Sequence, residues 1–213
     1  MKIAVLTAMD SEYRQFVSLQ QDNDLKDKTI VVKKCGIGKV NAGVNAFDLI
    51  RTQSPNLVIS TGVAGGCSED IEIMDVVVAC SVCYHDVWCG QPNVLGQIQG
   101  EPSEFFAPEE IIDKIKNQQL KNVKFGKTVS GDWFVDSVEK MRKIKTNFPD
   151  ATAVDMESAA IAQVCNQMNV PFISLRIISD IPLRENNHKQ YKDFWANIAD
   201  NSFNTAKEII KLV

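Results

Sequence analysis

Continuous runs of apolar, often β-branched residues are the feature of this sequence that most limits its fold. A strand buried on one face alternates apolar and polar residues, whereas several of these runs are uninterrupted, as is typical of strands covered on both faces. The sequence therefore predicts a sheet with helices on both sides. The runs occupy residues Lys2–Ala8, Thr29–Lys33, Asn56–Ser60, Asp75–Cys83, Val123–Val129, Thr152–Val154 and Pro171–Ile178.

Amphipathic helical patterns separate the apolar runs. They cover Ser11–Leu19, Val40–Thr52, Pro108–Gln118, Val135–Lys145, Glu157–Met168 and a final helix from Lys192 to Leu212. This alternation predicts an α/β fold with three layers, in which helices flank a central twisted sheet that is mostly parallel or mixed. The chain has 213 residues and shows no internal repeat or linker, so we expect a single domain over residues 1–213.

Charge and hydropathy exclude several classes of partner. The formal net charge is −4 and the two signs are interspersed, which argues against a nucleic-acid-binding protein. No apolar stretch approaches the ~20 residues of a membrane span. The N-terminal MKIAVLTAMDSE lacks the longer apolar core of a signal peptide. We therefore expect a cytoplasmic protein with no membrane partner.

The cysteines and histidines give little support to metal or redox chemistry. The six cysteines lie in apolar segments, as reduced core thiols do in cytosolic proteins. Cys80 and Cys83 form a CxxC pair with His85 two residues later, but this segment has the pattern of a strand, whereas a redox motif begins a helix. A zinc site needs a second ligand pair, and His188 is the only other histidine. We expect no metal.

Polar residues follow the predicted strands, where ligands bind in open α/β sheets. The segments are Met9–Glu12, Thr61–Gly66, Ser130–Val135, Asp155–Glu157 and Ser179–Asp180. Four acidic clusters and one glycine-rich turn are thus expected to meet at one edge of the sheet.

Each of these segments also has a purely structural explanation. Asp10 or Ser11 can cap a helix, and Glu12 is favoured in a first helical turn. The TGVAGG turn lacks the spacing of a dinucleotide or P-loop motif, and a tight turn explains it equally well. Glu157 is the exception: it starts an alanine-rich helix without an evident cationic partner, and an unpaired buried carboxylate is costly.

Taken together, the motifs resemble one family. They are KIAVLTAMDSE, CGIGKVNAG, STGVAGG, DVVVACSVCYHD, VSGDWFV, NFPDATAVDMESAAIAQVC and VPFISLRIISD, and they extend nearly from end to end. The chain is similar to the 5′-methylthioadenosine/S-adenosylhomocysteine nucleosidases of the nucleoside phosphorylase-like superfamily. The resemblance implies a cofactor-free hydrolase, a glycosidase of methionine salvage. It would cleave the N-ribosidic bond of both nucleosides to adenine and the 5′-thioribose sugar.

The resemblance also implies three catalytic carboxyl groups. Asp180 would protonate the purine at N7, Glu157 would bind the ribose hydroxyls and stabilise positive charge on the sugar, and Glu12 would deprotonate the attacking water. These are the tasks that cleavage of a glycosidic bond through an oxocarbenium-like transition state requires.

The remaining substrate contacts come from the same resemblance. Phe134 would stack on the purine, the backbone of Val135 would bind its edge, Met156 would line the ribose, Arg176 would lie near the ribose and Glu12, and Tyr191 would close the site. Val63, Gly65 and Ser179 complete this set, with Val63 standing where some relatives have Ser. Asp155 is expected to be a cap or a support of the site.

Residues 87–104 depart from the family pattern. The resemblance implies a homodimer with this segment near the interface, where the neighbouring subunit's loop covers the 5′ substituent. Here the segment is shortened and has Trp88, Cys89 and Gln99 in unusual places. The resemblance therefore predicts how this chain recognises adenine and ribose better than it predicts how the chain recognises the 5′ group.

Three alternative functions remain open at this point. A purine nucleoside phosphorylase of the same fold needs cationic groups for phosphate, but the chain has only five arginines, and Glu12 would repel the anion. A futalosine hydrolase is compatible with the unusual 87–104 segment. A non-catalytic nucleoside-binding protein is the least expected, because Glu12, Glu157 and Asp180 are all present.

Overall fold

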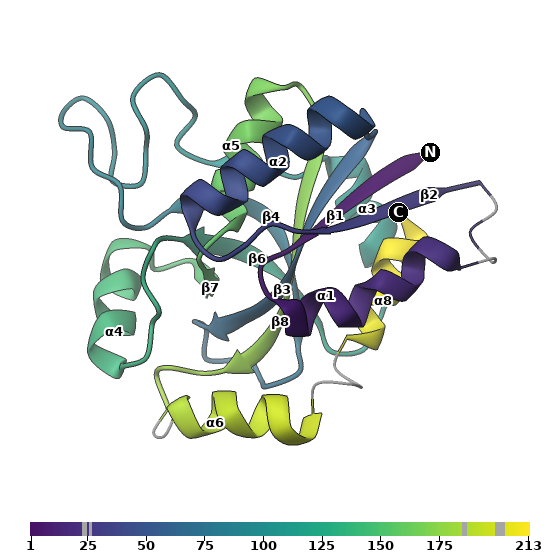
Figure 1. The fold of residues 1–213 in the computed structure, drawn as a ribbon. Coiled ribbons are helices and arrows are strands. Elements are labelled where there is room, and N and C mark those ends of the chain that lie inside the picture. Colours follow the sequence, from purple (N-terminus) through teal and green to yellow (C-terminus); the bar gives the residue numbers. More distant parts are fainter. Residues whose placement is uncertain (23–24, 26, 185–186, 199–202) are drawn as a thin grey trace.

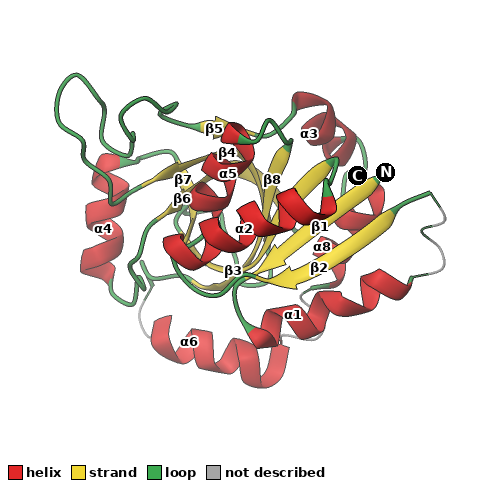
Figure 2. Ribbon diagram, turned by 45° about the horizontal axis from the view of Figure 1, so that its top comes forward, coloured by secondary structure: helices red, strands yellow, loops and turns green. Residues whose placement is uncertain are grey.

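The computed structural model describes residues 1–22, 25, 27–184, 187–198 and 203–213. Within them, eight strands form one mixed sheet with helices on both faces, which confirms the predicted fold class (Figures 1 and 2). The strands are β1 (Lys2–Thr7), β2 (Thr29–Lys34), β3 (Leu57–Gly66), β4 (Val76–Tyr84), β5 (Phe105–Phe106), β6 (Val123–Ser130), β7 (Ala151–Asp155) and β8 (Phe172–Asp180). The helices are α1 (Asp10–Phe16), α2 (Lys39–Gln53), α3 (Glu109–Lys116), α4 (Val138–Asn147), α5 (Ser158–Gln167), α6 (Asn187–Asp193) and α8 (Asn204–Leu212).

The sheet curls back on itself. Its order is β2-β1-β3-β7-β6-β4-β5, and β8 pairs with both β3 and β4. The strands β3, β7, β6, β4 and β8 therefore form a closed circuit of paired strands. The β3–β8, β4–β6 and β6–β7 pairs are parallel, whereas the β3–β7 and β4–β8 pairs are antiparallel.

Strand β1 shows why its sequence is continuously apolar. Its alternate residues enter two different cores: Ile3 and Val5 pack on one face of the sheet, and Ala4 and Leu6 on the other. Helices α1, α3 and α8 supply the first core, and α2 and α5 supply the second, as their positions in Figure 1 show. Burial on both faces removes the need for polar residues at every second position.

The glycine-rich segment that was predicted to be a turn is part of a strand. Residues 61–66 continue β3, and Gly65 and Gly66 pair with Val154 and Ala153 of β7. A Cβ atom on Gly66 would lie 2.6 Å from the side chain of Ile71. The glycines therefore allow close packing at the point where the circuit of strands closes, and the prediction of a turn was wrong.

The predicted final helix is also different. Residues 192–212 comprise the end of α6, a π-helical turn (Phe194–Ile198) and α8, while residues 199–202 lie outside the described part. The ring centroids of Phe194 and Phe203 are 6.4 Å apart, whereas one straight helix would separate these residues by roughly 13 Å along its axis. Both rings pack in the core beside α1, so residues 192–212 do not form the one straight helix that was predicted.

Other expectations concern cysteines and membranes. All six cysteines are free, and Cys80 and Cys83 lie within β4 as predicted. The described residues contain no group of three or more potential metal ligands, and the side chain of His188 lies outside the described part. No helix in the described part is long and apolar enough to span a membrane.

Candidate active site

A cavity lies at the edge of the sheet where β1, β7 and β8 end, next to α6. Ten of the eleven predicted site residues line it: Glu12, Val63, Gly65, Phe134, Val135, Met156, Glu157, Ser179, Asp180 and Tyr191. The four acidic segments and the glycine-rich segment all contribute residues to this cavity, as expected, but Ser130–Val135 does so through Trp133, Phe134 and Val135 and not through its acidic residue. In that segment Asp132 lies off the cavity, where it accepts a hydrogen bond from the backbone N–H of Lys39.

Glu12 is held by backbone amides that follow the end of β1 and by one within β3. Its Oε2 accepts hydrogen bonds from the N–H groups of Ala8 and Met9, and its Oε1 accepts one from Val63, all at 2.9 Å. The side chain is 2% exposed, and burial raises the pKa of Glu12, while the charge of Arg176 and the three amides oppose this shift. Glu12 is therefore fixed in one orientation at the cavity wall.

Gly62 makes this orientation of Glu12 possible. A Cβ atom at Gly62 would lie 2.3 Å from Oε1 of Glu12, and the backbone has a φ of +148° there. No other residue type can let the carboxylate approach the strand so closely. The glycine-rich segment thus has a specific task that its sequence alone did not reveal.

Arg176 lies behind the cavity and does not line it. Its Nε donates to Oδ2 of Asp155 at 2.5 Å, and its Nη2 donates to Ser60 and Ser158 at 2.6 and 3.0 Å. Asp155 also accepts hydrogen bonds from the hydroxyls of Ser130 and Ser158 and from the Ser158 backbone, so it both caps α5 and neutralises the arginine. The prediction placed Arg176 near the ribose and Glu12; Arg176 does not line the cavity, but its charge acts on Glu12 and Glu157. The expected supporting place of Asp155 agrees with this network.

Glu157 faces the cavity from the start of α5. Its Oε1 accepts a hydrogen bond from the backbone N–H of Gly38 at 2.9 Å. Burial, helped by the neighbouring Asp155 charge, raises the pKa of Glu157 to about 7, and Arg176 opposes the shift. Since Arg176 is engaged by Asp155, Glu157 keeps an oxygen available for a ligand that donates hydrogen bonds.

Asp180 ends β8 on the other side of the cavity. The Ser179 hydroxyl donates to Oδ1 of Asp180 at 2.8 Å, and both residues are buried. Nearby, Phe134 and Tyr191 meet edge to face with ring centroids 5.6 Å apart, and the Tyr191 hydroxyl reaches Sδ of Met9 at 3.9 Å. The two rings form an apolar wall suited to a flat aromatic group.

Seven lining residues were not among the predicted ones. They are Ala8, Met9, Ile37, Ala64, Trp133, Val154 and Asp155. Most adjoin predicted residues in the sequence, so their presence follows from their neighbours. Ile37 is different: it enters from the loop before α2, and the CGIGK motif at residues 35–39 was the only available signal.

The geometry is suited to acid–base chemistry on a partly apolar, hydroxylated ligand. The carboxyl groups of Glu12, Glu157 and Asp180 line a cavity that also has an apolar wall. None of the described residues that line the cavity is Lys or Arg. Carboxylates on different sides of a ligand can stabilise a developing cation, donate a proton and accept another.

Comparisons with known proteins agree with this chemistry. The family model of the phosphorylase superfamily matches residues 2–211. A 5′-methylthioadenosine/S-adenosylhomocysteine nucleosidase from Staphylococcus haemolyticus is 37% identical, over 89% of this chain and 84% of the relative. The nucleosidase from Neisseria meningitidis in complex with methylthio-immucillin-A has a TM-score of 0.88 and 32% identity, covering 100% of this chain and 99% of that one. Futalosine hydrolase from Helicobacter pylori has a TM-score of 0.88 and 28% identity, covering 100% and 98%.

The close approach of Gly62 to Glu12 can be tested by stability. We expect Gly62→Ala to lower the free energy of unfolding by more than about 2 kcal/mol, because the methyl group displaces a buried carboxylate with three hydrogen bonds. Gly43→Ala is the matched control: it lies in α2 with its nearest neighbour atom at 3.8 Å, and alanine favours a helix. Urea unfolding of both variants measures the difference, and equal stabilities would contradict the packing described for Glu12.

The raised pKa of Glu157 predicts how stability changes with pH. The folded state binds this proton more tightly than the unfolded state, whose pKa is near 4.5, so the stabilisation is complete below pH 4.5 and is lost as the pH rises through about 7. Wild type should therefore lose on the order of 1–3 kcal/mol relative to Glu157→Gln over this range. Denaturant titrations at several pH values measure it. The exposed Glu139→Gln serves as control, and parallel curves for wild type and Glu157→Gln would refute the shift.

Proposed function

This chain belongs to the phosphorylase superfamily and, within it, to the 5′-methylthioadenosine/S-adenosylhomocysteine nucleosidases, and we propose that it hydrolyses the N-ribosidic bond of both nucleosides. The observation that carries the proposal is the placement of Glu12, Glu157 and Asp180 around one cavity with an aromatic wall. The products are adenine and the 5′-thioribose sugar.

The purine would lie against Phe134, with Asp180 beside its imidazole ring. Proton transfer from Asp180 to N7 lets the purine leave with the electron pair of the broken bond to C1′. The Ser179 hydroxyl, which donates to Asp180, holds the carboxyl group in place. Val135 and Tyr191 also line the cavity, so the backbone of Val135 would bind the edge of the base and Tyr191 would cover it from α6.

The ribose would lie between Met156 and Glu157. As the bond to the purine lengthens, positive charge develops on the sugar, and a carboxylate that binds the ribose hydroxyls stabilises it. The oxygen of Glu157 that does not bind Gly38 is available for this purpose. Val63 and Gly65 of β3 also line the cavity.

Glu12 would activate the water. Its three amide hydrogen bonds fix the carboxylate, and its raised pKa suits a group that accepts a proton near neutral pH. The oxygen of the water bonds to C1′, and its proton passes to Glu12. Phosphate is a poor alternative nucleophile, because the described lining residues provide no Lys or Arg and Arg176 is engaged by Asp155.

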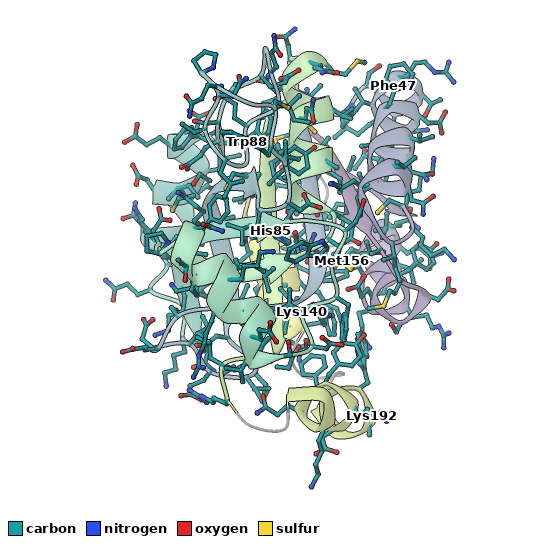
Figure 3. All side chains as sticks on the ribbon, turned by 90° about the vertical axis from the view of Figure 1, so that its left-hand side faces the viewer. Phe47, His85, Trp88, Lys140, Met156 and Lys192 are labelled. Carbon is teal, nitrogen blue, oxygen red and sulfur yellow. The ribbon has the colours of Figure 1, made fainter. Side chains whose placement is uncertain are left out.

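A homodimer is part of the proposal. Val40, Val44 and Phe47 lie on one side of α2 and are 77%, 63% and 48% exposed. Trp88 of the 87–104 segment is 57% exposed, and Figure 3 labels it with Phe47 toward the same end of the molecule. Apolar side chains at this spacing form a continuous stripe that a second copy can cover. We place the reaction in the cytoplasm, in methionine salvage, a setting consistent with six free cysteines.

Purine release tests the proposed reaction. Purified protein would receive 5′-methylthioadenosine, S-adenosylhomocysteine, adenosine, inosine and futalosine, each with and without phosphate, and free base would be measured by chromatography. We expect phosphate-independent adenine release from the two thio-nucleosides. We also expect Asp180→Asn and Glu12→Gln to fold but to lower kcat by about 10²–10⁴. Base release only from futalosine would refute the proposed substrates. Base release only in the presence of phosphate would refute water as the nucleophile.

The oligomeric state tests the dimer separately. Val44→Glu places a charge in the middle of the α2 stripe, so it should shift the mass in solution from two chains to one. Gln118→Glu, exposed just beyond α3, adds the same charge elsewhere and should leave the dimer intact. Light scattering after gel filtration gives both masses. A dimeric Val44→Glu variant would mean that α2 is not the interface.

A further inference from the structure

Two loops contribute residues to the cavity, and Asp86 forms hydrogen bonds with both of them. The first loop, residues 36–39, donates the Gly38 N–H to Glu157. The second, residues 131–135, contains Trp133, Phe134 and Val135, which line the cavity. Asp86 lies two residues after the end of β4 and belongs to neither loop.

The Asp86 carboxylate joins the loops through one oxygen. Oδ2 binds Nζ of Lys39 at 2.8 Å and accepts the backbone N–H of Asp132 at 2.9 Å. The connection is closed by the Lys39 backbone N–H, which donates to Oδ1 of Asp132 at 2.8 Å. The side chain of Asp86 is 8% exposed, and its charge strengthens both interactions of Oδ2.

The residues before Asp86 support the same arrangement. Nζ of Lys39 lies 5.5 Å from the ring centroid of Tyr84, and His85 packs edge to face on Trp133 at 5.4 Å. A Cβ atom on Gly131 would lie 2.4 Å from the His85 ring and 2.8 Å from Cγ of Asp86. Burial lowers the pKa of His85, which keeps the ring neutral. Figure 3 shows His85 and Met156 in the same region, beside the helix that carries Lys140.

We propose that Asp86 is a positioning residue that holds the purine-side loop (residues 131–135) against the ribose-side loop (residues 36–39). This inference rests on the proposed function. Asp86 would set the distance between Glu157 and the aromatic wall against which the purine would lie. Asp86 touches no substrate in this arrangement. It acts through the backbone of Asp132 and through Lys39, whose neighbour Gly38 orients Glu157.

The contacts of Asp86 allow a substitution that removes its charge and keeps its shape. Oδ1 of Asp86 has no hydrogen-bond partner in the described part of the chain, so an amide can replace it without breaking a bond. Asp86→Asn keeps an acceptor for the Asp132 N–H and removes the charge that holds Lys39. Lys39→Met removes the same ion pair from the other side and keeps the Lys39 backbone.

The test compares KM with kcat for 5′-methylthioadenosine. We expect Asp86→Asn and Lys39→Met each to raise KM about tenfold, with kcat and Tm close to wild type. The double variant should also show about a tenfold rise, not a hundredfold one, since both changes remove one interaction. Asp48→Asn is the control: it breaks the Lys33–Asp48 pair, 2.8 Å long, which lies outside the cavity lining, and should leave KM unchanged.

The outcomes separate this inference from the proposed function. An unchanged KM, a fall in kcat that follows a lowered Tm, or fully multiplicative effects in the double variant would each overturn the role of Asp86. Wild-type protein that releases no adenine would instead refute the proposed function, whatever the variants show. Because Lys39→Met tests the same contact, a failure of Asp86→Asn to fold would not remove the test.

Discussion

The buried pair of Arg176 and Asp155 is the interaction on which the site depends. Arg176 is 1% exposed, and its guanidinium faces Asp155, Ser60 and Ser158. A buried cation is stable only with such partners, and it in turn lowers the cost of placing other carboxylates nearby. Its charge opposes the rise in the pKa of both Glu12 and Glu157. One arginine behind the cavity thus lets acidic groups remain in front of it.

Glycines are as important to this arrangement as the charged residues, because they leave space for neighbouring side chains. Gly62 admits the carboxylate of Glu12, Gly66 admits Ile71 where β3 meets β7, and Gly131 admits the ring of His85. In each case backbone and side chain approach more closely than a Cβ atom permits. Gly62 and Gly66 belong to the closed circuit of strands, and Gly62 contacts the catalytic candidate Glu12. The position of this carboxylate therefore depends on the packing of the sheet.

Local sequence predicted the strands and the acidic residues because both depend on short-range pattern. Continuous apolar runs predicted strands buried on two faces, and polar residues after them marked one edge. The antiparallel β3–β7 and β4–β8 pairs were not accessible in this way, because they join segments far apart in the chain. The contacts of Arg176 with Asp155, Ser60 and Ser158 were not accessible either, because the pattern gives its strand but not the direction of a long side chain. His85 attracted attention only as a possible metal ligand, and its contact with Trp133 depends on tertiary packing.

The charge around the cavity also decides which nucleophile the site can accept. Glu12, Glu157 and Asp180 line the cavity, while the buried Arg176 behind it is directed at Asp155. Carboxylate groups stabilise a sugar that becomes positive and disfavour an anion that would attack it. In the proposed reaction, water is neutral until it transfers a proton to Glu12, so it meets no such barrier. The electrostatic arrangement proposed to favour departure of the purine therefore also favours hydrolysis over phosphorolysis.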